Sequence, residues 1–268
     1  MEYYVVDVFT DRLFGGNPAG VCLLTEWPGD ATMQSIAAEN NLSETAFLVK
    51  RVKHDGQYDL RWFTPETEID LCGHATMGSA YVLFTFVEQG AQTLRFHTQS
   101  GVLSVTKSDD MLWMDFPSRP GVQVPNYPCL AEALGVDDFY TYRSADIMVV
   151  VDRAETVQRL SPDFEVLKRI KHEANMPDDS FGVIVTGPGA DCDFVSRFFA
   201  PNAGICEDPV TGRAHCVLIP YWSQRLGMQH MTARQLSRRG GWIWCKDAGK
   251  RVGIGGKARL YLRGELMM

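Results

Sequence analysis

The residues with the clearest capacity for chemistry in this chain are Cys72 and His74, which flank a glycine in the stretch DLCGHATMGSAYVLFTFV (residues 70–87). A thiol at the start of a helix can serve as a nucleophile or as an acid and base. An imidazole takes up and releases protons near neutral pH. The residues that follow are almost entirely apolar, so the segment predicts a helix that is buried on every side and carries reactive groups at its amino-terminal end.

Two parts of the sequence resemble one another. FTPETEIDLCGHAT (63–76) and FAPNAGICEDPVTGRAH (199–215) each have Phe-x-Pro after a strand-like run, then acidic residues, then a glycine that opens an apolar helix. TQSGVLSVTKSDD (98–110) and LSRRGGWIWCKDAG (236–249) form a second matching pair. Two copies at this spacing predict a duplicated α/β domain, with chance similarity as the alternative.

The boundary between the copies is expected in FPSRPGVQVPNYP (116–128), where prolines interrupt the strand pattern. This divides the chain into an amino-terminal domain of residues 1–118 and a carboxy-terminal domain of residues 119–268, whose last strand is free to pack back on the first domain. The two glycine-led helix starts should then face one another across a cleft between the domains. Helix amino termini present N–H groups and partial positive charge, so two of them predict a site for an anion, most simply a carboxylate.

The elements around these helices are mostly strands. Runs rich in β-branched and aromatic residues, separated by Gly, Pro, Asn and Asp, predict them. These runs occupy residues 3–9, 20–24, 46–50, 58–63, 93–98, 102–106, 112–116, 147–151, 181–186, 193–199, 242–246 and 258–262. Three further helices are predicted, over residues 30–41 with Asp30 as the cap, over 128–135 ending at a glycine, and over 163–174 with an amphipathic period.

Composition excludes several classes of partner. The chain has 33 acidic and 26 basic residues and a net charge of −7, whereas a protein that binds nucleic acid needs a basic face. The longest apolar run, residues 75–87, falls short of the roughly 20 residues that span a bilayer, so we predict no membrane segment. Seven cysteines without CxxC spacing or a preceding signal peptide predict a reduced, cytoplasmic protein.

Nucleotide and metal motifs are incomplete in this sequence. GPGADC (187–192) lacks the third glycine of a dinucleotide-binding loop, and GIGGKA (253–258) lacks both the first glycine and the hydroxyl residue of a phosphate-binding loop. The histidines show no metal-binding spacing. We therefore predict neither a cofactor nor a metal.

Four motifs stand in the order and at the spacing of one known family. They are GNPA (16–19), NLSETAF (41–47), DLCGHAT (70–76) and EDPVTGRAH (207–215). With them the sequence resembles the PhzF family of phenazine-biosynthesis-like isomerases over essentially its whole length. That family shares the diaminopimelate epimerase fold, so the resemblance implies an α/β (α+β) protein with two pseudo-symmetric domains, each a curved β-sheet around a central buried helix.

The resemblance also implies an activity and its residues. It implies a homodimer that isomerises a small carboxylate-bearing metabolite without a cofactor, by proton transfer through a glutamate. Glu44 matches that glutamate. His74 and Asp208 match the supporting polar residues at the two helix starts, and the backbone at Gly73 and Gly212 would hold the carboxylate. From the residues alone, His74 could equally cap the buried helix, and Asp208 could be a turn residue.

Three of the site residues raise separate questions. Glu44 lies at the mouth of a strand, where burial would strengthen a carboxylate as a base. Asn17, in GGNPAG, is either a turn residue or a contact in the site. Arg213 stands where family members usually carry Ser, and a cation in the first turn of a helix opposes the helix dipole. Its guanidinium should either turn to solvent or pair with an anionic substrate or with Asp208.

Racemases and epimerases of this fold use two opposed cysteines as acid and base, which raises an alternative mechanism. Cys72 has the right place before Gly73, but Thr211 stands at the matching place before Gly212. We therefore interpret Cys72 as a small apolar filler. A racemase or epimerase that uses Cys72, and a non-catalytic protein that binds small carboxylates, remain the alternatives.

Overall fold

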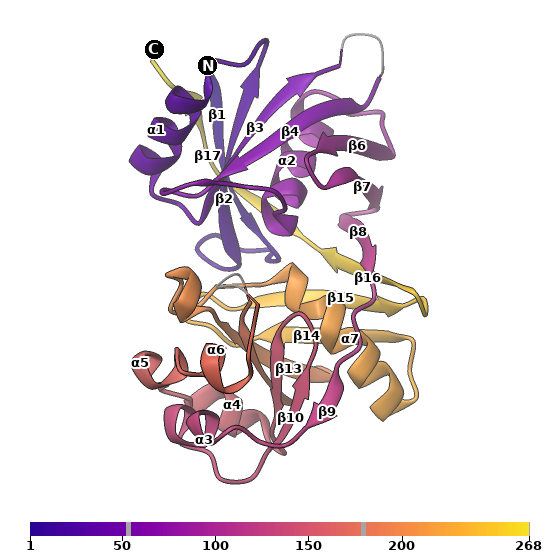
Figure 1. Cartoon of the computed structure of the whole chain (residues 1–268). Helices are drawn as coiled ribbons and strands as arrows, with labels where there is room; N and C mark the ends of the chain where they lie inside the picture. Colours follow the sequence, from indigo (N-terminus) through magenta and orange to yellow (C-terminus); the bar gives the residue numbers. More distant parts are fainter. Residues whose placement is uncertain (52–54, 178–180, 268) are drawn as a thin grey trace. The chain divides into compact units, whose positions relative to one another are not determined.

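The computed structural model describes residues 1–51, 55–177 and 181–267. The chain forms two compact units (Figure 1). Unit 1 comprises Met1–Asp115 and Ile254–Met268, and unit 2 comprises Phe116–Gly253. The chain passes between the units within two strands, β8 (Met111–Pro117) and β16 (Arg251–Gly256).

Unit 1 is a sheet whose strands enclose a helix. Its further elements are β1 (Glu2–Val8), β2 (Asn17–Leu24), α1 (Asp30–Asn40), β3 (Glu44–Lys50), β4 (Gln57–Phe63), β5 (Glu68–Ile69), α2 (Gly73–Phe86), β6 (Thr93–Thr98), β7 (Gly101–Ser108) and β17 (Ala258–Glu265). β1 pairs antiparallel with both β2 and β17, so the last strand belongs to the sheet of unit 1. β2 runs parallel to β3, and β4 runs parallel to β6.

Helix α2 is the buried centre of unit 1. It packs against β1, β2, β3, β7 and β17, and ten of its fourteen residues are buried. Gly78 permits this close approach, because a Cβ at that position would lie 3.3 Å from Val8 Cγ2. The predicted helix enclosed by strands is confirmed.

Unit 2 repeats this plan. Its further elements are β9 (Val122–Val124), α3 (Pro128–Leu134), β10 (Tyr140–Arg143), β11 (Ile147–Val150), α4 (Ala154–Arg159), α5 (Phe164–Leu167), α6 (Ile170–Glu173), β12 (Val183–Pro188), β13 (Phe194–Phe199), η1 (Pro201–Ala203), α7 (Gly212–Leu226), β14 (His230–Gln235) and β15 (Gly241–Asp247). Helices α3 to α6 contribute to a separate hydrophobic core with β11 to β13. α7, like α2, is largely buried.

The order of parallel and antiparallel pairings is the same in both units. In unit 1, β2–β3 is parallel, β3–β4 antiparallel, β4–β6 parallel and β6–β7 antiparallel. In unit 2, β11–β12 is parallel, β12–β13 antiparallel, β13–β14 parallel and β14–β15 antiparallel. α2 and α7 occupy the same place in this order. The predicted fold class, two related α/β units with a buried helix in each, is confirmed.

Two of the predicted helices differ in detail. The segment 163–174 forms two short helices, α5 and α6, and the Asp163 carboxylate caps the first by accepting from the N–H groups of Glu165 and Val166. The prediction of Asp30 as a cap for α1 is wrong. Gly29 holds the cap position, and the Asp30 carboxylate instead lies 2.8 Å from Arg61 Nη1.

Nothing in the helices of the described residues suggests a membrane span. Within residues 1–51, 55–177 and 181–267, no helix is both long enough and apolar enough to cross a bilayer. α7, at fifteen residues, lies below the roughly 20 that a crossing requires.

Candidate active site

The clearest cluster of chemical groups in unit 1 lies where strand β3 begins and helix α2 begins. Glu44 is the first residue of β3, and His74 stands in the first turn of α2. The Nε2 atom of His74 lies 3.1 Å from Oε2 of Glu44, and the two side chains are 8% and 13% exposed. Sequence reasoning expected His74 to orient Glu44 or relay a proton, and the structure places the two groups next to each other.

The other ring nitrogen of His74 faces Asn17 and Cys72. Asn17 Nδ2 lies 3.4 Å from His74 Nδ1, and Cys72 Sγ lies 3.5 Å from the same atom. β2 brings Asn17 here because it runs parallel to β3, with Ala19 opposite Glu44. The hydroxyl of Ser43 donates to Asn17 Oδ1 at 3.4 Å. The Asn17 side chain is fully buried, so its amide group faces protein atoms and not solvent.

The electrostatics of the cluster keep the Cys72 thiol protonated and favour a charged imidazole at His74. Burial, followed by the charge of Glu44, raises the pKa of the Cys72 thiol, so the thiol stays protonated at neutral pH. The helix terminus does not outweigh this effect, although a helix start ordinarily favours a thiolate. Burial alone would lower the pKa of His74, but Cys72 and Glu44 raise it above its usual value. Since Cys72 stays neutral, the Glu44 carboxylate is the charge that matters to the imidazole.

The same three side chains are the group in the described chain that could offer ligands to a metal. One donor atom each from Glu44, Cys72 and His74 lies within 4.8 Å of the others. The His74 ring places Nε2 beside Glu44, at 3.1 Å, and Nδ1 beside Cys72, at 3.5 Å, so different nitrogens face the two other donors. This arrangement fits a Glu44–His74 pair better than three ligands around one ion.

In unit 2, the residues before helix α7 form a hydrogen-bonded corner. The Thr211 hydroxyl donates to the Asp208 carboxylate, and the Thr211 N–H donates to Gln235 Oε1 at 2.9 Å. Gln235 Nε2 in turn donates to the carbonyl of Asp208 at 2.8 Å. Gln235 is 1% exposed, and together these bonds fix the turn that carries Asp208.

The first turn of α7 leaves room beside its glycine. Gly212 is buried, yet a Cβ there would meet nothing within 4 Å. His215 Nδ1 donates to the Thr211 carbonyl at 2.9 Å, and burial lowers the pKa of His215 to about 4, so the ring is neutral. A void beside a helix amino terminus is a place where an anion could approach backbone N–H groups.

Arg213 has a partner that sequence reasoning did not consider. Its Nη2 lies 2.5 Å and its Nε 3.2 Å from the two carboxylate oxygens of Asp146, which is 1% exposed. The N–H of Gly182 also donates to Asp146, at 2.8 Å. The Asp146 carboxylate compensates for the positive charge of Arg213 in the first turn of α7. The substrate-binding role of Arg213 stays a prediction.

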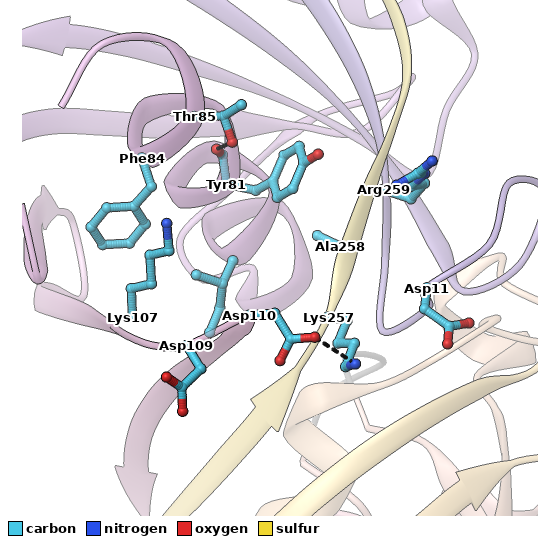
Figure 2. Close-up of a pocket in the computed structure, with 11 residues that line it drawn as sticks. Asp11, Tyr81, Phe84, Thr85, Lys107, Asp109, Asp110, Lys257, Ala258 and Arg259 are labelled. Atoms are coloured by element: carbon cyan, nitrogen blue, oxygen red, sulfur yellow. Dashed lines mark hydrogen bonds and ion pairs between the residues drawn. The ribbon is translucent and has the colours of Figure 1, made fainter. Parts of the chain in front are cut away.

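A hollow on unit 1 is separate from the Glu44 cluster. Figure 2 shows its lining by α2 residues such as Tyr81 and by charged side chains from the β7–β8 turn and the start of β17. Its volume is about 370 Å³. Three cations and three carboxylates line it, and Lys257 pairs with Asp110 at 2.6 Å, so it offers no excess charge of either sign.

The structure groups the predicted site residues by unit. Asn17, Glu44, Gly73 and His74 lie together in unit 1, while Asp208, Gly212 and Arg213 lie in or beside the start of α7 in unit 2. Three residues of these networks were missed, namely Ser43, Asp146 and Gln235. Ser43 stands within the quoted motif NLSETAF and could have been found there, whereas Asp146 and Gln235 have no local sequence signal.

Comparison with solved structures identifies the class first. The chain has the fold of a hydroxyproline epimerase from Agrobacterium vitis, with a TM-score of 0.62 over 98% of this chain and 91% of that one. At 11% identity the likeness is one of fold alone. The two repeated units and their buried helices thus define an α/β protein with the same fold as that epimerase.

The particular family follows from closer relatives. The family model described as phenazine biosynthesis-like protein, PhzC-PhzF, matches residues 6–264. A PhzF family protein from Enterococcus faecalis superposes with a TM-score of 0.92 at 46% identity, over 100% of this chain and 99% of that one. An uncharacterized isomerase of Pseudomonas aeruginosa is 48% identical over 266 residues, which cover 99% of this chain and 98% of the relative. The chain belongs to the PhzC-PhzF family, and the resemblance drawn from the four motifs is confirmed.

Proposed function

We propose that this protein is a cofactor-independent isomerase of a small carboxylate-bearing metabolite, with Glu44 as the acid and base. The observation that carries the proposal is the buried contact of 3.1 Å between Glu44 Oε2 and His74 Nε2 at the start of α2. Relatives that cover nearly the whole chain are named isomerases, and the fold is shared with an epimerase. Epimerases move a proton on carbon, and so do isomerases that shift a double bond.

The reaction has two proton transfers. The Glu44 carboxylate takes a proton from a carbon of the substrate, the electron pair of the broken C–H bond shifts into the adjacent unsaturated system, and Glu44 becomes a carboxylic acid. Glu44 then returns the proton to a different carbon, so the double bond has moved and no atom is gained or lost. His74 Nε2, which lies 3.1 Å from Glu44 Oε2, would hold the carboxylate in place during both steps.

Unit 2 would hold the substrate. We propose that residues 1–118 and 119–268 act as two domains with one active site in the cleft between them, in a cytoplasmic homodimer. The backbone at Gly73 and Gly212 would bind the carboxylate group, because each is at the start of a long helix. Asp208 is held by Thr211 and Gln235 in an orientation suited to a substrate contact, and Asn17 and Arg213 complete the proposed set.

The test is solvent-deuterium exchange. Small unsaturated carboxylates are incubated with the protein in deuterated water, and deuterium at carbon is measured by mass spectrometry. Glu44→Gln should abolish exchange into any substrate found, because a neutral amide cannot accept the proton. Cys72→Ala is the matched control, on the same helix start, and should retain it.

Two other outcomes point elsewhere. Exchange that is lost in Cys72→Ala and kept in Glu44→Gln would replace the glutamate mechanism by a thiol mechanism of the racemase and epimerase type. Tight carboxylate binding without exchange in wild-type protein or either variant would identify a binding protein that catalyses nothing.

A further inference from the structure

Two hydrogen bonds link Ser43, Asn17 and His74, and the far side of the His74 ring lies beside Glu44. The Ser43 hydroxyl donates to Asn17 Oδ1 at 3.4 Å, and Asn17 Nδ2 lies 3.4 Å from His74 Nδ1. His74 Nε2 lies 3.1 Å from Glu44 Oε2. An amide nitrogen can only donate and an amide oxygen can only accept. With its oxygen held by Ser43, the Asn17 amide therefore presents N–H groups to the imidazole.

We infer that Asn17 is a positioning residue, which keeps His74 neutral with its single proton on Nε2, the ring nitrogen that lies beside Glu44. His74 Nδ1 accepts from the Asn17 amide, so its lone pair is occupied. A second proton on Nδ1 would point at the N–H groups of Asn17. Because Asn17 is buried, rotating its amide to relieve this contact would break its other hydrogen bond and cost free energy.

This inference rests on the proposed function for its catalytic meaning. When Glu44 takes a proton from the substrate, a neutral His74 that already carries a proton on Nε2 cannot accept another at that atom. Asn17 blocks the alternative, which is uptake at Nδ1. The proton therefore stays on Glu44 for return to the substrate and does not become trapped in an imidazolium–carboxylate pair.

The surroundings of His74 explain why such a device is needed. Among the described residues, the titratable groups that act on His74 are Cys72, beside Nδ1, and Glu44, beside Nε2. Both favour the charged imidazole when they carry negative charge. Cys72 Sγ, at 3.5 Å from Nδ1, could also accept a proton from that atom, so the amide of Asn17 decides which nitrogen is protonated.

The experiment reads the protonation of the ring directly. Protein labelled with ¹⁵N-histidine is studied by long-range ¹H–¹⁵N NMR at pH 7, and His74→Gln identifies the signals of His74. In wild-type protein we expect one protonated nitrogen, Nε2, and one bare nitrogen, Nδ1. Asn17→Asp has the same shape but accepts at Nδ1, so both nitrogens should be protonated. Ser43→Ala frees the amide oxygen and should give a mixture.

Some results would overturn the inference. A wild-type His74 that carries its proton on Nδ1, or carries two protons at pH 7, contradicts it without any variant, and so does an Asn17→Asp signal identical to that of wild-type protein. In the exchange assay, Asn17→Asp should lower the rate by at least about 10-fold and move its pH profile. If Glu44→Gln keeps full exchange while the NMR result holds, the proposed function fails and the protonation state of His74 stands.

Discussion

Replacing Arg213 by serine should lower the free energy of unfolding, because it leaves the buried carboxylate of Asp146 without its cation. Breaking a fully buried ion pair by removing one partner costs about 3–5 kcal/mol, whereas an exposed pair contributes at most about 1 kcal/mol. This pair lies between those limits, since its side chains are 35% and 1% exposed. Asp146 also keeps the N–H of Gly182 at 2.8 Å. We expect a loss of about 2–3 kcal/mol.

Urea denaturation at pH 7, followed by circular dichroism, measures this loss. A matched control is Arg225→Ser at the other end of the same helix, where the arginine is exposed and donates to the Tyr221 hydroxyl, so its loss should cost under about 1 kcal/mol. The double variant Arg213→Ser/Asp146→Ser removes both charges. It should be more stable than the sum of the single variants predicts, by about 1–2 kcal/mol, because no unpaired charge remains buried.

The reasoning fails if the Arg213→Ser and Arg225→Ser variants have equal free energies of unfolding. It also fails if the effects of Arg213→Ser and Asp146→Ser on the free energy of unfolding are additive. Either result would mean that the guanidinium does not rest on Asp146 in solution. Arg213 would then be available for the anionic substrate that the sequence alone suggested.

Two further predictions concern buried side chains. The free energy of unfolding should fall as pH drops from 6.5 to 4, because the unfolded chain takes up a proton that the buried His215, with a pKa lowered to about 4, does not. The full shift corresponds to about 3 kcal/mol, and His215→Gln should lose that part of the slope in urea titrations at pH 7 and 4.5. Iodoacetamide should alkylate the buried Cys72, whose thiol pKa is raised by burial, at least about 10-fold more slowly than the exposed Cys206. Equal rates in peptide mass spectra would contradict this and favour thiol chemistry.

The sequence predicts those helices and strands whose residues form a clear local pattern. The apolar runs gave α2 and α7, and the β-branched runs gave most strands, because hydrophobic period and turn residues are written into adjacent positions. Strand β14, HMTARQ, was missed because its run is polar and short, and β16, RVGIGG, because three of its six residues are glycine. Both become strands through pairing with neighbours, which is a tertiary effect.

The candidate site also combines residues that the sequence predicts with residues that it does not. Glu44 and His74 could be named from motifs, but the partners that fix them lie far along the chain. Ser43 and Asn17 are separated by 26 positions, Gln235 and Thr211 by 24, and Arg213 and Asp146 by 67. No spacing rule connects such pairs, because the fold alone brings them together.

The starts of α2 and α7 share one backbone interaction but carry different side chains. In each unit the fourth residue of the helix bonds back to the carbonyl of the cap residue, Thr76 to Cys72 at 2.6 Å and His215 to Thr211 at 2.9 Å. Two positions earlier the units differ, with His74 in one and Arg213 in the other. An imidazole beside a carboxylate can exchange a proton near neutral pH, whereas a guanidinium cannot lose one.

The proposed function therefore assigns proton transfer to unit 1. In unit 2, the equivalent positions hold a fixed cation on Asp146, a neutral His215 and an Asp208 carboxylate that accepts from Thr211. The proposed function assigns these groups to substrate binding. If the two units share one active site as proposed, substitutions at Glu44 or His74 should act on the chemical step, and substitutions at Asp208 should act first on substrate affinity.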